Sequence, residues 1–143
     1  MIILDTNVIS ALMRPNANPE VLRWLDQQPR SSVWTTSVTV MELRYGLNIM
    51  PAGRRRDALV QEMEQVFTND IQGRIALFDS AAAEHAAELL ASRRGQGRGA
   101  ELRDTMIAGI ALATRATLAT RNTAHFADLD PGIVNGVVNP WTE

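Results

Sequence analysis

Three carboxylates lie within or beside short apolar segments of the sequence: Asp5, Glu42 and Asp104. The segments in question are residues 1–4, 37–43 and 106–111. A buried carboxylate is unfavourable unless it pairs with a cation or binds a metal ion. Three such acids in one domain favour a site where a divalent cation offsets their shared negative charge. Carboxylate oxygens suit magnesium or manganese, and the chemistry that follows is metal-assisted hydrolysis of a phosphodiester.

Two of these acids also have an ordinary structural interpretation. Asp5 follows a predicted strand, where aspartate is common as a turn or cap residue. Asp104 begins a predicted helix, where the helix dipole favours a negative charge. Its helical neighbours at the following turns are apolar: Ile107, Ala108 and Ala111. The sequence therefore leaves a capping role and a metal-binding role open for both residues.

Glu42 is predicted to lie on or beside the apolar side of its helix. Residues three and four apart share a helix face, and the neighbours of Glu42 on this spacing are apolar. The predicted apolar side consists of Val38, Met41, Tyr45 and Ile49. The alternative to a metal ligand is a buried ion pair with an arginine such as Arg44 or Arg121.

The elements that must position these acids alternate between strands and helices. We predict strands at residues 1–4, 32–36, 74–78 and 117–120, with a short fifth at 133–138. Helices are predicted at residues 6–12, 19–28, 37–49, 54–68, 81–94 and 103–115. This alternation favours an α/β fold with three layers: a mostly parallel sheet of four to five strands between helices. No domain boundary is evident, so we expect residues 1–143 to form a single domain.

In such sheets, sites form in the crevice beyond the carboxyl ends of the strands. Asp5 and Asn122 both follow predicted strands at that position. His125 is close to Asn122 and could contact a phosphate or cap a turn. The mechanistic hypothesis is that Asp5 and Asp104 hold the ion and that Glu42 holds an outer ligand or orients the attacking water. Arg121 would then steady the backbone of the phosphodiester substrate.

Composition excludes several other function classes. The chain has no cysteine, so it can form neither a disulfide nor a thiolate metal site. All 14 basic residues are arginine, which excludes a P-loop and other folds that need a lysine. The arginine clusters at 54–56 and 93–103 are predicted to be solvated helix faces. No apolar run approaches the ~18 residues of a membrane span, so we expect a cytoplasmic protein with no membrane partner.

Five short motifs together resemble a known family, the PIN-domain ribonucleases. They are ILDTNVIS at residues 3–10, SVTVMELRYG at 37–46, DTMIAG at 104–109, TRN at 120–122 and NPW at 139–141. The nearest likeness is to VapC toxins of bacterial type II toxin–antitoxin pairs, in the FitB-like branch. The resemblance spans nearly the whole chain and implies a PIN-like fold.

The resemblance also implies an activity and partners. It implies an endoribonuclease dependent on Mg²⁺ or Mn²⁺ that inhibits translation by cutting tRNA or rRNA. Asp5, Glu42 and Asp104 carry over as metal ligands, with Thr6 and Asn7 as supporting polar residues. A homodimer and a complex with a cognate antitoxin are implied, with operator DNA contacted only through the antitoxin.

One departure from the family pattern leaves alternatives open. Many family members have a fourth acid near the position of Asn122 or His125, and this chain has none there. Fewer negative charges weaken ion binding, so we expect a single tightly held ion in the RNA-free protein. The alternatives are a DNA or flap-type nuclease with the same metal centre, or a catalytically degenerate toxin that acts as a binding and autorepression partner.

Overall fold

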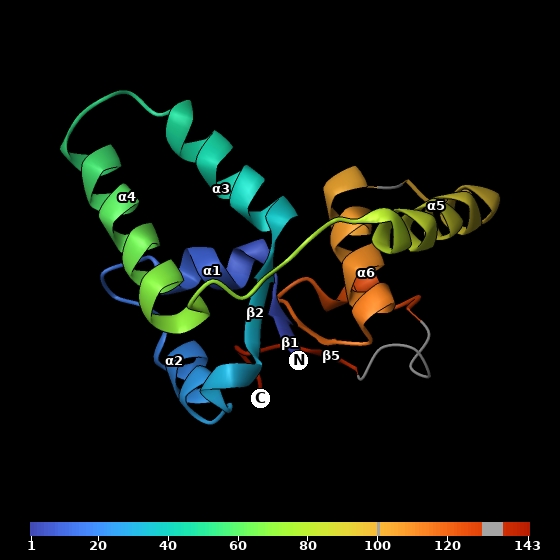
Figure 1. Cartoon of the computed structure of the whole chain (residues 1–143), viewed down its shortest axis with the longest axis horizontal. Coiled ribbons are helices and arrows are strands. Elements are labelled where there is room, and N and C mark those ends of the chain that lie inside the picture. The colour runs from blue at the N-terminus through green and yellow to red at the C-terminus, as the bar shows by residue number, and fades with distance from the viewer. Residues whose placement is uncertain (100, 130–135) are drawn as a thin grey trace.

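A five-stranded parallel sheet forms the centre of the molecule (Figure 1). The computed structural model describes residues 1–99, 101–129 and 136–143. The strand order is β3-β2-β1-β4-β5. The strands are β1 (Ile2–Leu4), β2 (Val33–Thr36), β3 (Ile75–Ala76), β4 (Thr117–Ala119) and β5 (Val137–Val138). The predicted strands are confirmed with small changes at their ends, although residues 133–135 of the predicted fifth strand lie outside the described residues.

Six α-helices flank this sheet in the described part of the chain. They are α1 (Thr6–Leu12), α2 (Pro19–Asp26), α3 (Ser37–Asn48), α4 (Arg54–Val66), α5 (Ser80–Gly95) and α6 (Leu102–Thr114). Figure 1 shows α1 to α4 on one side of the strands and α5 with α6 on the other. The predicted three-layer α/β architecture is confirmed. No helix in the described ranges is long and apolar enough to cross a membrane.

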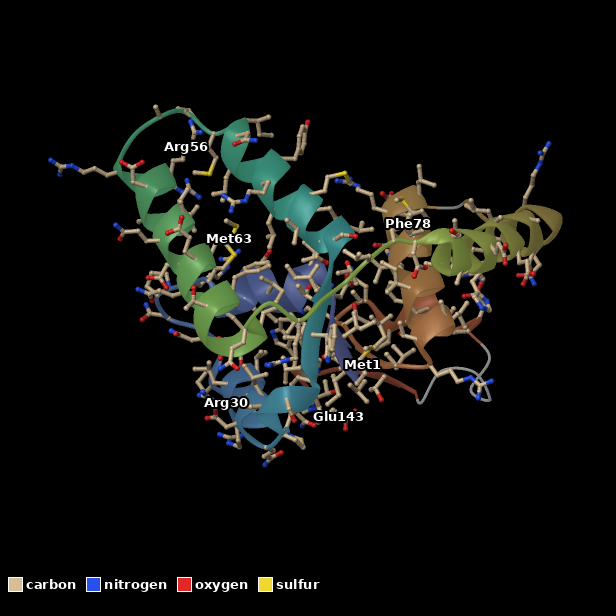
Figure 2. The ribbon with its side chains drawn as sticks, in the orientation of Figure 1. Met1, Arg30, Arg56, Met63, Phe78 and Glu143 are labelled. Carbon is tan, nitrogen blue, oxygen red and sulfur yellow. The ribbon has the colours of Figure 1, made fainter. Side chains whose placement is uncertain are left out.

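The two faces of β1 contribute side chains to two separate apolar cores. Because side chains alternate along a strand, Ile3 packs into the core under α5 and α6, and Leu4 packs into the core under α1 to α4. Both residues are fully buried. Figure 2 shows Met63 on the inner side of α4, where it joins the second core. Burial on both faces fixes β1 rigidly, and with it the acid that follows directly.

Gly109 allows α5 and α6 to approach each other closely. A Cβ atom at this position would lie 2.5 Å from the backbone oxygen of Ala82 and 3.0 Å from the Cβ of Ala86. Both alanines are buried on α5. The close packing therefore depends on small residues in both helices, and it sets the position of α6, which carries Asp104 at its start.

The predicted apolar side of α3 is wrong in part. The side chains that α3 buries are Val38, Thr39, Leu43 and Leu47. Met41, Tyr45 and Ile49 are instead 50%, 58% and 65% exposed. The helix carries two apolar stripes about 200° apart, and the stripe at 39, 43 and 47 is the one that packs on the sheet. Its N-cap is Thr36, whose side chain accepts a hydrogen bond from the Thr39 amide at 3.0 Å.

Candidate active site

A polar cleft opens beyond the carboxyl ends of β1 and β4. Its volume is about 810 Å³. All seven residues predicted from the sequence to belong to the site line it: Asp5, Thr6, Asn7, Glu42, Asp104, Arg121 and Asn122. The other lining residues are Ser10, Ala11, Arg14, Asn16, Asn18, Pro19 and Trp141. The structure thus brings the predicted residues into one cleft, and their catalytic roles stay predictions.

Asp5 is the most buried acid of the cleft, with only 3% of its surface exposed. It follows β1 and is the N-cap of α1, accepting a hydrogen bond from the Thr6 amide at 2.8 Å. Its second oxygen accepts hydrogen bonds from Thr120 Oγ1 at 2.7 Å and from Asn7 Nδ2 at 3.2 Å. The capping role that the sequence left open is therefore present, and it fixes the carboxylate at the cleft wall.

The charge of Asp5 is poorly compensated in this position. Burial raises the pKa of Asp5 from 3.8 to about 6 against the lowering effect of its hydrogen bonds from Thr120 and Thr6, with repulsion from Asp104 and Glu42 adding to the rise. Among the described residues, no arginine or histidine forms an ion pair with Asp5. A buried, unpaired carboxylate next to two other acids is typical of a site that takes a cation.

Glu42 is held by a chain of threonine hydroxyls. Thr6 Oγ1 donates to Glu42 Oε1 at 2.9 Å and lies 3.0 Å from Thr39 Oγ1. Thr36 Oγ1 donates to Thr39 Oγ1 at 3.3 Å. A hydroxyl has a single proton, so Thr39 must donate to Thr6, and every bond of the chain points toward the carboxylate. Glu42 also lies 3.6 Å from the guanidinium of Arg103, an ion-pair partner that the sequence did not indicate.

Asn7 and Thr120 tie α1 to the segment that follows β4. Asn7 Oδ1 accepts from the Arg121 amide at 3.1 Å, and its Nδ2 donates to Thr120 Oγ1 at 3.2 Å. Thr120 Oγ1 also accepts from the Asn122 amide at 3.0 Å. These bonds hold the turn that carries Arg121 and Asn122 against Asp5. In the sequence, Thr120 stands out only as part of a motif, and nothing there indicates its contact with Asp5.

Asp104 lies in the first turn of α6, as predicted, with its side chain 19% exposed. Its Oδ2 is 2.8 Å from His125 Nδ1. This contact with Asp104 was not among the roles that the sequence left open for His125, which were contact with a phosphate and capping of a turn. The 3₁₀ turn of residues Thr123–Phe126 carries His125 and begins just after Asn122.

Arg93 joins the elements behind Asp104 and His125. It is only 3% exposed, so the prediction of a solvated face is wrong for this residue. Its guanidinium forms two hydrogen bonds of 2.9 Å to Asp128, one of 2.9 Å to Thr105 Oγ1 and one of 2.7 Å to the His125 carbonyl oxygen. These bonds lower the pKa of Asp128. Nothing in the sequence distinguishes Arg93 from the neighbouring arginines.

The donor set of the cleft suits a hard cation, although its acids do not converge on one point. In residues 1–99, 101–129 and 136–143, no three acidic or histidine side chains are close enough together to enclose an ion. Magnesium is usually held by one or two carboxylates and keeps several waters. The oxygen-rich lining, the unpaired charge of Asp5 and the room in the cleft fit such a hydrated ion better than a closed cage of three acids.

Comparisons with known proteins place the chain in a family. Residues 2–130 match the PIN domain. The chain is 41% identical to the plasmid stability protein StbB of Pseudomonas syringae pv. tomato, with 99% of each covered. It is 38% identical to the VapC ribonuclease Y4jK of Sinorhizobium fredii, covering 99% of this chain and 98% of that protein. It is 36% identical to toxin FitB of Neisseria gonorrhoeae, with 99% of each covered.

Solved structures agree with these matches. The structure of FitAB bound to an IR36 DNA fragment has a TM-score of 0.83 at 35% identity, covering 100% of this chain and 97% of that chain. FitAcB from Neisseria gonorrhoeae has the same TM-score and identity, with 100% of each chain covered. The fold, the motifs and the shared length lead to one assignment: the chain belongs to the PIN-domain family, among the relatives of the VapC and FitB toxins.

Proposed function

We propose that this protein is a divalent-metal-dependent endoribonuclease, the toxin of a toxin–antitoxin pair, which hydrolyses RNA phosphodiesters to inhibit translation. One observation carries the proposal. Carboxylates from three separate elements, Asp5, Glu42 and Asp104, line one cleft, and the most buried of them has no ion-pair partner among the residues that the structure describes. Relatives of the chain support the same reaction, since one is a VapC ribonuclease and another a toxin.

The residues have separate roles in the proposed reaction. Asp5 would hold Mg²⁺ or Mn²⁺, because Thr120 and Asn7 fix its carboxylate in place. Asp104 would supply a second oxygen from α6. A divalent cation bound here would supply the positive charge that a phosphodiester and its attacking water need for hydrolysis. Glu42, held by Thr6, would orient the attacking water or hold an outer ligand.

Partners follow from the relatives. Solved relatives include FitAB bound to a DNA fragment, DNA-bound VapBC from Salmonella typhimurium and a member of the VapBC family of toxin–antitoxin systems. We propose that this chain likewise binds a cognate antitoxin, forms a homodimer or a larger complex with it, and reaches operator DNA only through that partner. The RNA substrate that we propose is tRNA or rRNA, because cutting either would inhibit translation.

The test is cleavage by three variants against a matched control. Asp5→Asn and Asp104→Asn should lose Mn²⁺-dependent RNA cleavage by about 100-fold or more, and Glu42→Gln should be impaired as well. Glu88→Gln is the control, because Glu88 is exposed on α5 and outside the cleft. Each protein is incubated with total RNA and with DNA of matched sequence, in Mn²⁺ and in EDTA.

Each outcome of this assay separates the proposal from its alternatives. RNA cleavage that needs metal and needs Asp5 supports the proposal. Preferential cutting of the DNA would favour a DNA nuclease with the same centre. A wild-type chain that neither binds Mn²⁺ in calorimetry nor cuts RNA would be a degenerate toxin that acts only through its partner. Activity retained in pure Asp5→Asn would overturn the assigned site.

A further inference from the structure

The cleft contains an aromatic and cationic shelf beside the acids, formed by Arg121 and Trp141. The guanidinium carbon of Arg121 lies 5.1 Å from the centroid of the Trp141 ring. Both residues line the cleft that also holds Asp5 and Asp104. The metal chemistry described above uses neither the ring nor the guanidinium plane, so the shelf calls for a separate explanation.

The shelf is held rigidly at a fixed position relative to Asp5. Arg121 follows Thr120, which donates a hydrogen bond to Asp5, and its own amide donates to Asn7 at 3.1 Å. Trp141 is partly buried against the apolar core under α1 to α4, and its amide donates to Asn139 Oδ1 at 2.9 Å. The indole is therefore supported from the protein side, and the exposed guanidinium covers it at the cleft.

Arg121 is also available to a ligand. In the described ranges it forms no ion pair with an acidic side chain. The cleft is also lined by a second exposed arginine and two exposed asparagines, Arg14, Asn16 and Asn18. It thus combines acidic side chains with basic and amide-bearing ones. A hydrated cation would occupy only part of about 810 Å³, a volume in the range that holds small organic ligands.

We propose that the shelf of Arg121 and Trp141 is a stacking subsite for an unpaired RNA base next to the cut phosphodiester. This inference rests on the proposed function. Single-stranded RNA is recognised by stacking bases on aromatic rings and on arginine planes, because every base has a flat π face. An arginine alone would serve a phosphate, whereas the tryptophan beneath Arg121 holds its guanidinium flat, so that the outer face of the guanidinium can stack on a base. The substrate at this position is therefore a single-stranded or splayed nucleotide.

The probe is a fluorescein-labelled oligoadenylate 12-mer, compared with a 12-mer of the same backbone that lacks its bases. Binding is measured by anisotropy with the full chain in EDTA, so that metal-dependent cleavage does not occur. Wild type should bind the oligoadenylate on the order of 10-fold more tightly than the abasic strand. The ratio of the abasic to the oligoadenylate dissociation constant should fall close to one in Trp141→Leu. Trp141→Phe should keep most of the wild-type ratio.

Arg121→Lys tests the cationic half of the shelf with the charge retained. Lysine has no flat face, so the ratio should fall several-fold while the salt dependence of binding stays unchanged. Arg55→Lys is the control, because Arg55 is exposed on α4 and outside the cleft. Thermal unfolding of each variant checks the fold, and Trp141→Phe and Arg121→Lys keep the test valid if Trp141→Leu does not fold.

The possible results separate the subsite from the nuclease assignment. The subsite would be overturned if wild type bound the abasic and oligoadenylate strands with nearly equal dissociation constants. It would also be overturned if the ratio of these two constants were unchanged in both Trp141→Leu and Arg121→Lys. Either result would count even if wild type cuts RNA in Mn²⁺. A base preference in a chain that cuts no RNA would overturn the nuclease and support the stacking site. Loss of antitoxin binding in Trp141→Leu with an unchanged RNA ratio would assign the shelf to the protein partner and overturn the inference.

Discussion

Asp5→Asn should make the metal-free protein more stable at neutral pH, and the gain should depend on pH. The pKa of Asp5 is about 6 in the folded protein, against the ordinary aspartate value of 3.8 that applies to the unfolded chain. An acid whose pKa is higher in the folded protein than in the unfolded chain favours the folded state only while it is protonated. Its contribution is therefore present at the lowest pH and is lost as pH rises from about 4 through about 6.

The size of the effect follows from the two pKa values. A carboxyl group whose pKa rises from 3.8 to about 6 on folding destabilises the folded state by about 3 kcal/mol at neutral pH and by little at pH 3. Asparagine carries no charge and avoids this cost. Its amide would face the donors Asn7 and Thr120, which adds a penalty of about 1 kcal/mol that does not depend on pH. The difference in unfolding free energy, variant minus wild type, should therefore rise by about 2 to 3 kcal/mol between pH 4 and pH 7.5.

Urea denaturation in EDTA at half-unit pH steps measures this difference, with linear extrapolation to water. Glu88→Gln, which is exposed on α5, should show a difference that hardly changes with pH. Adding Mn²⁺ should stabilise wild type by about 2.7 kcal/mol at 100 times its dissociation constant, and should stabilise Asp5→Asn much less. If the unfolding free energy of Asp5→Asn minus that of wild type does not change with pH, or falls as pH rises, the idea that Asp5 is a buried and uncompensated charge is refuted.

Three further changes test how the fold positions the acids. Gly109→Ala should lower the unfolding free energy by about 1 to 3 kcal/mol in urea denaturation, because the added methyl group would overlap the backbone of α5; unchanged stability would contradict the close packing. Arg93→Met should cost about 3 kcal/mol and reduce RNA cleavage, because it leaves the His125 carbonyl without its donor and Asp128 with Arg98 as its remaining cationic partner, whereas Arg94→Met, on the exposed side of α5, should change neither in the same assays. Thr120→Val should weaken Mn²⁺ binding in calorimetry several-fold, because Asp5 loses its shortest hydrogen bond; equal affinity would remove Asp5 from the metal site.

Local signals in the sequence, with the family motifs, were sufficient for the elements and for half of the residues that line the cleft. Strand and helix periodicity predicted the three layers, since each apolar segment has to bury a face. Asp5 and Asn122 could be assigned to one edge of the sheet because they follow parallel strands, whose carboxyl ends meet there. The motifs around Glu42 and Asp104 added two residues from helices. These four residues line one cleft, together with Arg121 and with Thr6 and Asn7, which the family resemblance implied.

Other features depended on packing that no local pattern encodes. The sequence of α3 offers two apolar stripes, and only contact with the sheet buries Leu43 and leaves Tyr45 exposed. Arg93 looks like its neighbours along the chain, and the carboxylate that pairs with it lies 35 residues away.

The sequence by itself determined which acids and amides reach the edge of the sheet, because a residue's place after a strand or on a helix face is a local property. Tertiary structure alone decided how those groups are held: Asp5 buried under hydrogen bonds from Thr120 and Asn7, Asp104 against His125, and Arg121 over Trp141. Those contacts join residues from distant parts of the chain. Their geometry is fixed only when both cores have packed against the sheet.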